Sequence, residues 1–108
     1  MSFGDDQGFN GKISRCIGRA LDALGEGVKQ SLYFQIQQKY HLDKEEIPFK
    51  PEEVIERLRE ILGPTGSSFV ERILAREIRN EFQLDFKEGR PLSAVIKEAK
   101  EKFLDVSD

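Results

Sequence analysis

The stretch VKQSLYFQIQQKYHLD at residues 28–43 shares its pattern with VERILAREIRNEFQLD at residues 70–85, at an offset of 42 positions. In each stretch an apolar residue stands at every fourth position, and a Leu-Asp pair closes the pattern. Positions four apart lie on one side of an α-helix, so each stretch predicts a helix with an apolar ridge. The two ridges are Val28, Leu32, Ile36 and Tyr40, and Val70, Leu74, Ile78 and Phe82.

A second correspondence lies just before each ridge, at an offset of 38 positions. It pairs Ile17, Arg19, Leu24 and Gly25 with Ile55, Arg57, Leu62 and Gly63. An insertion over residues 64–67 explains why the two offsets differ. Either a helix pair was duplicated, or two amphipathic helices align by chance; the pattern is compatible with both.

Apolar spacing predicts five helices and no strand pair, over residues 12–24, 26–41, 51–62, 68–82 and 91–106. Pro51 and Pro91 suit helix starts, and Gly63 is expected to end the third helix. Ser68 with Glu71 forms the capping box typical of a fourth helix. Segment 1–11 is glycine-rich and acidic, and we expect a flexible arm there. The expected fold is all-α: a compact bundle of about five helices over residues 12–108.

The composition describes one small globular domain. A chain of 108 residues with 34% charged and 38% hydrophobic residues can bury a single core. The net charge of −3 argues against broad affinity for nucleic acids, which clustered cations provide. One cysteine excludes an internal disulfide, and no apolar run is long enough for a membrane span or signal peptide. We therefore expect a cytoplasmic protein.

The sequence holds no recognisable catalytic, cofactor-binding or metal-ligating set. Residues 63–68 could bind an anion if they open a helix N-terminus, but they lack the lysine of a phosphate-binding loop. Cys16 stands between two arginines that would favour a thiolate, yet it flanks an apolar stripe and is expected to pack as a small hydrophobe. His41 is expected in the last turn of a helix, where its charge complements the dipole.

Two arginine-bearing helix faces form a candidate basic patch. Arg15 and Arg19 share a face of the first helix with Lys12. The second face carries Arg72, Arg76 and Arg79. If the faces converge, they would bind an acidic protein or a nucleic acid; interspersed glutamates favour pairing within the fold instead.

Three aromatic residues form a candidate partner surface: Tyr33, Phe34 and Phe69. Tyr33 and Phe34 follow Leu32 directly, so one helix cannot point all three side chains into a single core. Either that helix is central in the bundle, or an exposed apolar patch marks a partner site. A homodimer would satisfy both readings.

Several short segments resemble a small archaeal helical family, the Nitrosopumilus output domain, over residues 13–103. They are Leu24-Gly25-Glu26, Val28-Lys29, Leu32-Tyr33, the run from Glu45 to Pro48, Leu62-Gly63-Pro64 and Val70-Glu71. The resemblance implies an all-helical module without known activity that serves as an output part of signalling proteins.

These observations favour a non-enzymatic module that presents a helical surface to a protein partner or to its own copy. Two alternatives from other classes remain open. In the first, the arginine faces bind a nucleic acid; in the second, residues 63–68 bind a small anionic ligand. No cofactor and no membrane partner is expected.

Overall fold

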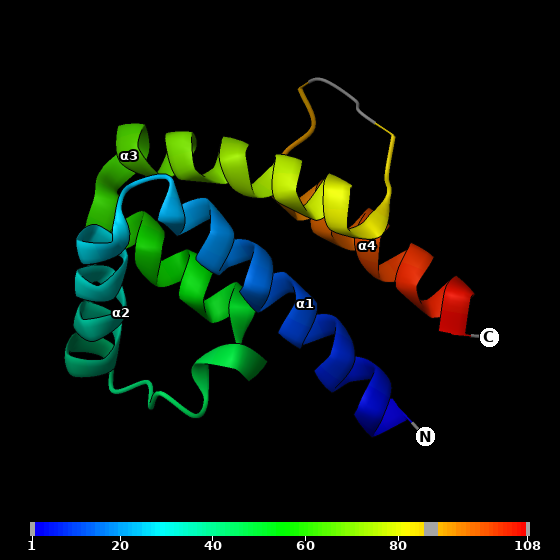
Figure 1. Ribbon diagram of the computed structural model, residues 1–108, viewed down its shortest axis with the longest axis horizontal. Coiled ribbons are helices and arrows are strands. Elements are labelled where there is room, and N and C mark those ends of the chain that lie inside the picture. Colours follow the sequence, from blue (N-terminus) through cyan, green and yellow to red (C-terminus); the bar gives the residue numbers. More distant parts are fainter. Residues whose placement is uncertain (1, 86–88, 108) are drawn as a thin grey trace.

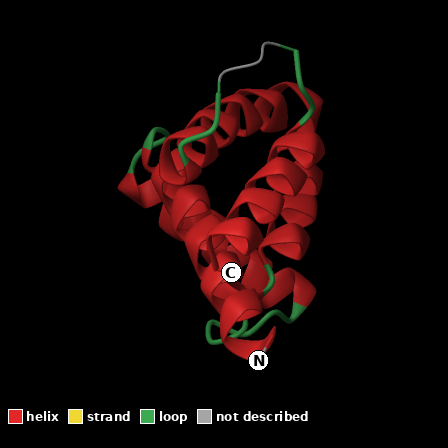
Figure 2. Cartoon of the chain, turned by 90° about the vertical axis from the view of Figure 1, so that its right-hand side faces the viewer, coloured by secondary structure: helices red, strands yellow, loops and turns green. Residues whose placement is uncertain are grey.

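The computed structural model describes residues 2–85 and 89–107, with side chains described for residues 8–85 and 89–105. This part of the chain contains four α-helices, one 3-10 helix and no strand. Their bounds are α1 (Ser2–Asp22), α2 (Glu26–Tyr40), η1 (Ile47–Phe49), α3 (Pro51–Phe82) and α4 (Leu92–Ser107). Loops and turns occur between the helices (Figure 2). The all-α expectation is confirmed, with four helices in place of about five.

Helix α1 crosses the middle of the molecule and packs most extensively against α3 (Figure 1). Helix α3 turns back on itself, so that its two halves lie on either side of α1, while α4 packs against its second half. Helix α2 lies at one edge. The core therefore forms where α1, both halves of α3, and α4 meet.

Helix α1 begins well before the predicted start at Lys12, at Ser2. The expected arm over residues 1–11 is therefore wrong for the segment from Ser2 onward, which continues the helix. Phe9 explains the difference, because it stands four residues before Ile13 and extends the same apolar stripe into the core. Burial of this aromatic ring outweighs the low helix propensity of the neighbouring glycines. The side chains of residues 1–7 lie outside the described part.

Gly63 bends α3 instead of separating two helices by a loop. Its backbone angles (φ 75°, ψ 176°) are not helical, and Pro64 continues the helix directly after it. A proline suits this place because the first residues of a helical segment need no amide donor. The predicted third and fourth helices are therefore one kinked element. Ser68 and Glu71 lie inside it, so the predicted capping box is wrong.

The two glycines of the offset-38 pairing share a backbone conformation. Gly25, like Gly63, combines a positive φ (102°) with an extended ψ (150°) and directly precedes a helical segment. Gly25 is the residue that caps the N-terminus of α2. His41 and Gln83, which are 42 positions apart, are the left-handed caps that end α2 and α3. Duplication of a helix pair stays a prediction. The matching backbone conformations of the two glycines and of the two caps are compatible with it.

The core residues follow the predicted stripes except in α2, where Val28 and Tyr40 of the predicted ridge lie outside the core. The largest fully buried side chains belong to α1, α2, α3 and α4, and include Ile13, Ile17, Leu21, Ile36, Val54, Leu74, Ile78 and Val95. Val28 begins the first predicted ridge but is 45% exposed. Helix α2 lies at the edge and buries only Leu32 and Ile36, so its ridge is shorter than the sequence predicts.

Candidate functional site

The two predicted arginine faces do not form one basic patch. Arg19 on α1 donates through Nε to Glu77 Oε1 at 3.1 Å and through Nη2 to Glu81 Oε1 at 2.8 Å. Lys12 Nζ adds an ion pair to Glu81 at 3.4 Å. The hydrogen bond from Arg19 lowers the pKa of Glu81 below its ordinary value. These glutamates pair with Lys12 and Arg19 where α1 meets α3, whereas Arg72, Arg76 and Arg79 line a groove to which no residue of α1 contributes.

The second face of α3 forms a groove with the segment that leads into α4. We define the arginine groove by Phe69, Arg72, Arg76 and Arg79 on α3 and Arg90 before α4. Ile73, Leu84 and Leu92 contribute apolar lining, and the cavity measures about 930 Å³. It therefore combines one predicted aromatic with all three predicted arginines of α3.

The groove has an excess of positive charge. Glu71, the one carboxylate lining it in the described part, receives two hydrogen bonds from Arg59 at 2.9 and 3.1 Å. Arg90 lies 3.9 Å from Glu98. Arg72 and Arg76 are exposed and have no hydrogen bond or ion pair with any described residue. An exposed guanidinium group can bind a carboxylate or phosphate through two parallel N–H donors.

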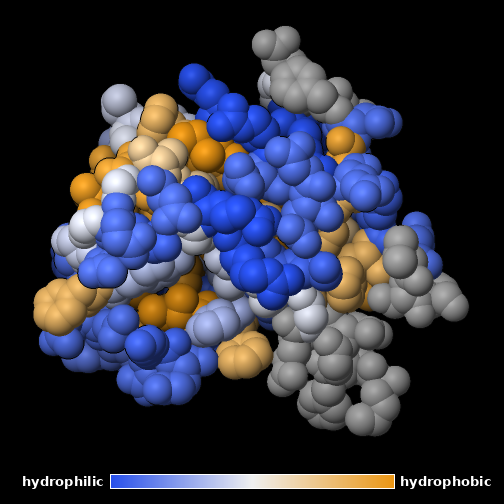
Figure 3. Space-filling view, in the orientation of Figure 1, coloured by the Kyte–Doolittle hydropathy of each residue, from blue (hydrophilic) through white to orange (hydrophobic). Residues whose placement is uncertain are grey.

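The three predicted aromatic residues do not share one surface. Tyr33 is half-buried and packs against the core, and burial raises the pKa of its hydroxyl. Phe34 is 61% exposed on α2, whereas Phe69 is 49% exposed on α3. Figure 3 shows an apolar area over the bend of α3, beside the segment that carries Phe69. Phe69 alone of the three lines the arginine groove.

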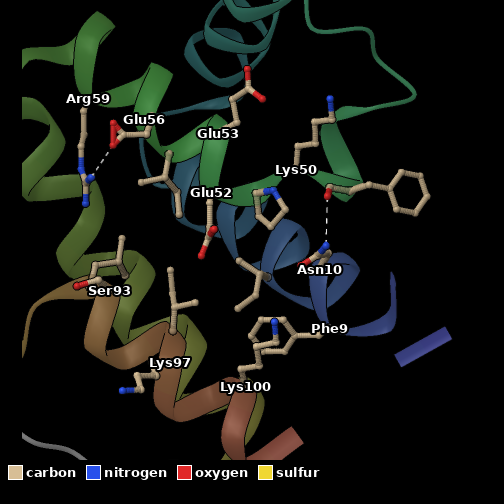
Figure 4. Close-up of a pocket in the computed structure, with 16 residues that line it drawn as sticks. Phe9, Asn10, Lys50, Glu52, Glu53, Glu56, Arg59, Ser93, Lys97 and Lys100 are labelled. Atoms are coloured by element: carbon tan, nitrogen blue, oxygen red, sulfur yellow. Dashed lines mark hydrogen bonds and ion pairs between the residues drawn. The ribbon is translucent and has the colours of Figure 1, made fainter. Parts of the chain in front are cut away.

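A second groove, of about 850 Å³, lies between α1, the start of α3 and α4 (Figure 4). Its apolar lining includes Phe9, and its polar side chains have both signs. Glu52 points into the cavity from the first turn of α3, and Lys97 and Lys100 approach it from α4. Because carboxylates and ammonium groups lie together here, this groove selects charge less sharply than the arginine groove does.

The predicted anion site at residues 63–68 is wrong, because no loop exists there. Residues 64–68 are helical, and the Ser67 hydroxyl donates to the Pro64 carbonyl oxygen at 3.3 Å. The expected loop is replaced by a bend at Gly63 with Pro64 directly after it, and proline has no amide donor to offer a ligand. Gly63 serves the bend of α3 instead.

Cys16 and His41 both have structural roles: Cys16 packs in the core and His41 ends a helix. Cys16 is completely buried, and burial raises the pKa of its thiol despite a contact of 3.5 Å from Arg19 Nη2 to its Sγ atom. The prediction of a small packed hydrophobe is confirmed. His41 is exposed and stands one position beyond the end of α2, as its left-handed cap. Among the described residues, no group of three or more His, Cys, Asp and Glu side chains is placed to hold a metal ion.

No family model matches this chain, and neither curated proteins nor solved structures provide a match. The archaeal family resemblance therefore stays a prediction. No helix in the described part has the length and apolar character needed to cross a membrane.

The sequence predicted one wall of the arginine groove and missed the other. Arg72, Arg76 and Arg79 recur at helical spacing, which the sequence makes visible. The opposing wall comes from Leu84, Arg90 and Leu92, whose position depends on how α4 folds back onto α3. The proximity of Pro91 to Arg90 was the available signal, since the predicted helix start places this arginine at the end of a connection.

Proposed function

We propose that this chain is a non-enzymatic interaction module whose arginine groove binds an acidic, apolar-containing segment of a partner protein. The main supporting observation is that Phe69, Arg72 and Arg76 line one groove and that the two arginines have no hydrogen bond or ion pair with any described residue. Apolar contact gives binding free energy, and the guanidinium groups select carboxylates at its rim. An amphipathic helix that lays its apolar side into a groove is a common mode of peptide recognition. The family resemblance supports a role as a signalling output.

A protein partner suits the groove better than a nucleic acid. Single-stranded nucleic acids bind tracks of cations that follow several phosphates, with aromatic side chains between them. Here Lys12 and Arg19 of α1 are paired with Glu77 and Glu81, so these two cations do not extend the arginine groove into a longer positive track. The groove's apolar lining, including Ile73 and Leu92, suits leucine or phenylalanine side chains.

Fluorescence anisotropy with two synthetic peptides tests this proposal. One is an amphipathic helix with leucine on one side and glutamate on the other, and its analogue has glutamine in place of every glutamate. We expect the acidic peptide to bind and the analogue to bind at least about tenfold more weakly, a difference of about 1.4 kcal/mol. Equal binding of both peptides would contradict a role for the arginines.

A matched pair of variants locates the binding site. Arg76→Glu reverses a charge in the groove, and Arg15→Glu reverses the charge of another exposed arginine that has no partner among the described residues. We expect Arg76→Glu to weaken binding of the acidic peptide about fivefold to tenfold, and Arg15→Glu to leave it within about twofold. A single-stranded oligonucleotide that binds more tightly than the acidic peptide would replace this proposal with the nucleic-acid alternative.

A further inference from the structure

The second groove, between α1, the start of α3 and α4, has opposite charges on different helices (Figure 4). The carboxylates that line it in the described part come from near the start of α3, at Glu52, Glu53 and Glu56. Lys97 and Lys100 contribute ammonium groups from α4. Glu52 points into the cavity, and the two lysines approach the same cavity. We call it the mixed-charge groove.

Three charges of the mixed-charge groove are left without a partner in the described part of the chain. Glu52, Lys97 and Lys100 are exposed and have no hydrogen bond or ion pair with any described residue. The other charged residues that line the groove are paired with neighbours: Lys50 with Glu46, Glu53 with Arg57, and Glu56 with Arg59. Unpaired charges of opposite sign therefore line one groove without pairing with each other.

Apolar side chains line the same groove. Phe9, Ile13 and Ile55 are buried there, and Ile96 is half-buried. An aliphatic chain that lies against these side chains would remove apolar surface from water, which favours binding. The cavity of about 850 Å³ is within the range of small-molecule sites, which are mostly apolar with a few charged or polar groups that fix the orientation of the ligand.

We propose that the mixed-charge groove binds a small zwitterion with an ammonium group at one end, a carboxylate at the other and an aliphatic chain between them. The ammonium group pairs with Glu52, and the carboxylate pairs with Lys97 and Lys100. A ligand with one charge leaves the opposite charge of the groove unpaired, so the groove selects an arrangement of charges. This site is independent of peptide binding by the arginine groove, because the two grooves have no charged residue in common.

Heteronuclear NMR titrations with ω-aminooctanoate, octanoate and octylamine test the proposal. We expect ω-aminooctanoate to bind in the millimolar range and to shift the amide signals of Glu52, Ile55 and Lys97. Octanoate and octylamine each lack one of the two charges and should bind at least about fivefold more weakly. A groove that only collects apolar chains would instead prefer these two compounds, because each has a methyl group where the zwitterion has a charge. Equal or tighter binding of either compound would overturn the proposal, and so would shifts centred on Arg76 of the arginine groove.

Variants test each end of the ligand separately. Glu52→Gln should abolish the preference for ω-aminooctanoate over octanoate, because the ammonium group loses its partner. Lys97→Gln combined with Lys100→Gln should abolish the preference over octylamine. Glu45→Gln and Lys44→Gln make the same changes of charge at exposed residues outside the groove, and both preferences should remain.

Each preference is a ratio measured within one variant, so a general loss of stability does not imitate the expected result. Circular dichroism should show equal helix content in all variants, because the substituted side chains are exposed. Unchanged preferences in the groove variants would overturn the proposal, as would loss of a preference in a control variant. Neither result would affect binding of the acidic peptide by the arginine groove, which is measured with another ligand and with Arg76→Glu.

Discussion

Arg19 shows how one residue joins two helices at the scale of a side chain. Its guanidinium binds both Glu77 and Glu81, and the pKa of Glu81 is lowered as a result. A carboxyl with a lowered folded-state pKa stabilises the protein above its unfolded value and loses this effect as pH falls. We expect Arg19→Ala to reduce the free energy of unfolding by about 0.5–1 kcal/mol at pH 7. Urea unfolding should show this difference shrinking as pH falls from the ordinary glutamate pKa of 4.5 through the lower folded value. A difference that stays constant down to pH about 2 would contradict the assignment.

The reactivity of Cys16 provides a test of how well a single side chain is buried. Its thiol is completely buried with a raised pKa, and only the thiolate reacts readily with disulfide reagents. We expect no reaction with Ellman's reagent in the folded protein and one equivalent after unfolding in guanidinium. Cys16→Ser should cost about 1–3 kcal/mol because a hydroxyl replaces an apolar group in the core. Rapid labelling of the folded protein, at the rate of a free thiol, would contradict this burial.

Gly63 determines the shape of helix α3, because the helix bends at the backbone of this residue. An L-residue there must adopt a φ of 75° with an extended ψ, although a Cβ would meet no atom within 4 Å. The expected cost of Gly63→Ala is therefore backbone strain alone, about 1–3 kcal/mol. Gly11→Ala is the control, since Gly11 lies inside α1 with the same open space around its Cα. Thermal unfolding should show destabilisation by the first variant and stabilisation of about 0.5–1 kcal/mol by the second. Equal effects would show that the bend does not depend on glycine.

Proline positions predicted two helix starts, whereas local signals did not predict how the elements join. Pro51 and Pro91 lie at the predicted helix starts, since proline geometry is a property of the residue itself. Gly63 was recognised as an interruption, but the sequence does not say whether a loop or a bend follows it. The expected loop at 63–68 failed for this reason. The start of α1 was placed too late because the burial of Phe9 depends on α3 and α4, which are distant in the sequence.

At the scale of the molecule, tertiary contacts decided the candidate site. The arginines of α3 were visible as a helical face, but their separation from Arg19 required the packing of α1 against Glu77 and Glu81. The second wall of the arginine groove likewise required α4. Periodicity identifies a face, whereas only the packing of helices decides which charges are paired and which face an open groove.

A cluster of three phenylalanines joins three helices of the whole molecule. Phe9 of α1 lies 5.4 Å from Phe82 of α3 and 5.7 Å from Phe103 of α4, measured between ring centroids. We expect Phe9→Ala to cost about 3–5 kcal/mol, because it leaves a cavity in the core. In a double-mutant cycle with Phe103→Ala, the two effects should be coupled by about 0.5–1.5 kcal/mol. The control cycle pairs Phe9→Ala with Phe69→Ala, whose ring lies in the arginine groove on another part of α3.

Additive effects in the control and coupled effects in the cluster would show that α1 and α4 stabilise each other through these rings. Both cycles should be measured by urea unfolding at one protein concentration, so that the stabilities are compared under the same conditions. Additivity in both cycles would instead mean that each ring contributes through its burial alone. Since Phe9 precedes the predicted helix start, coupling would also establish that the first turns of α1 belong to the cooperative fold.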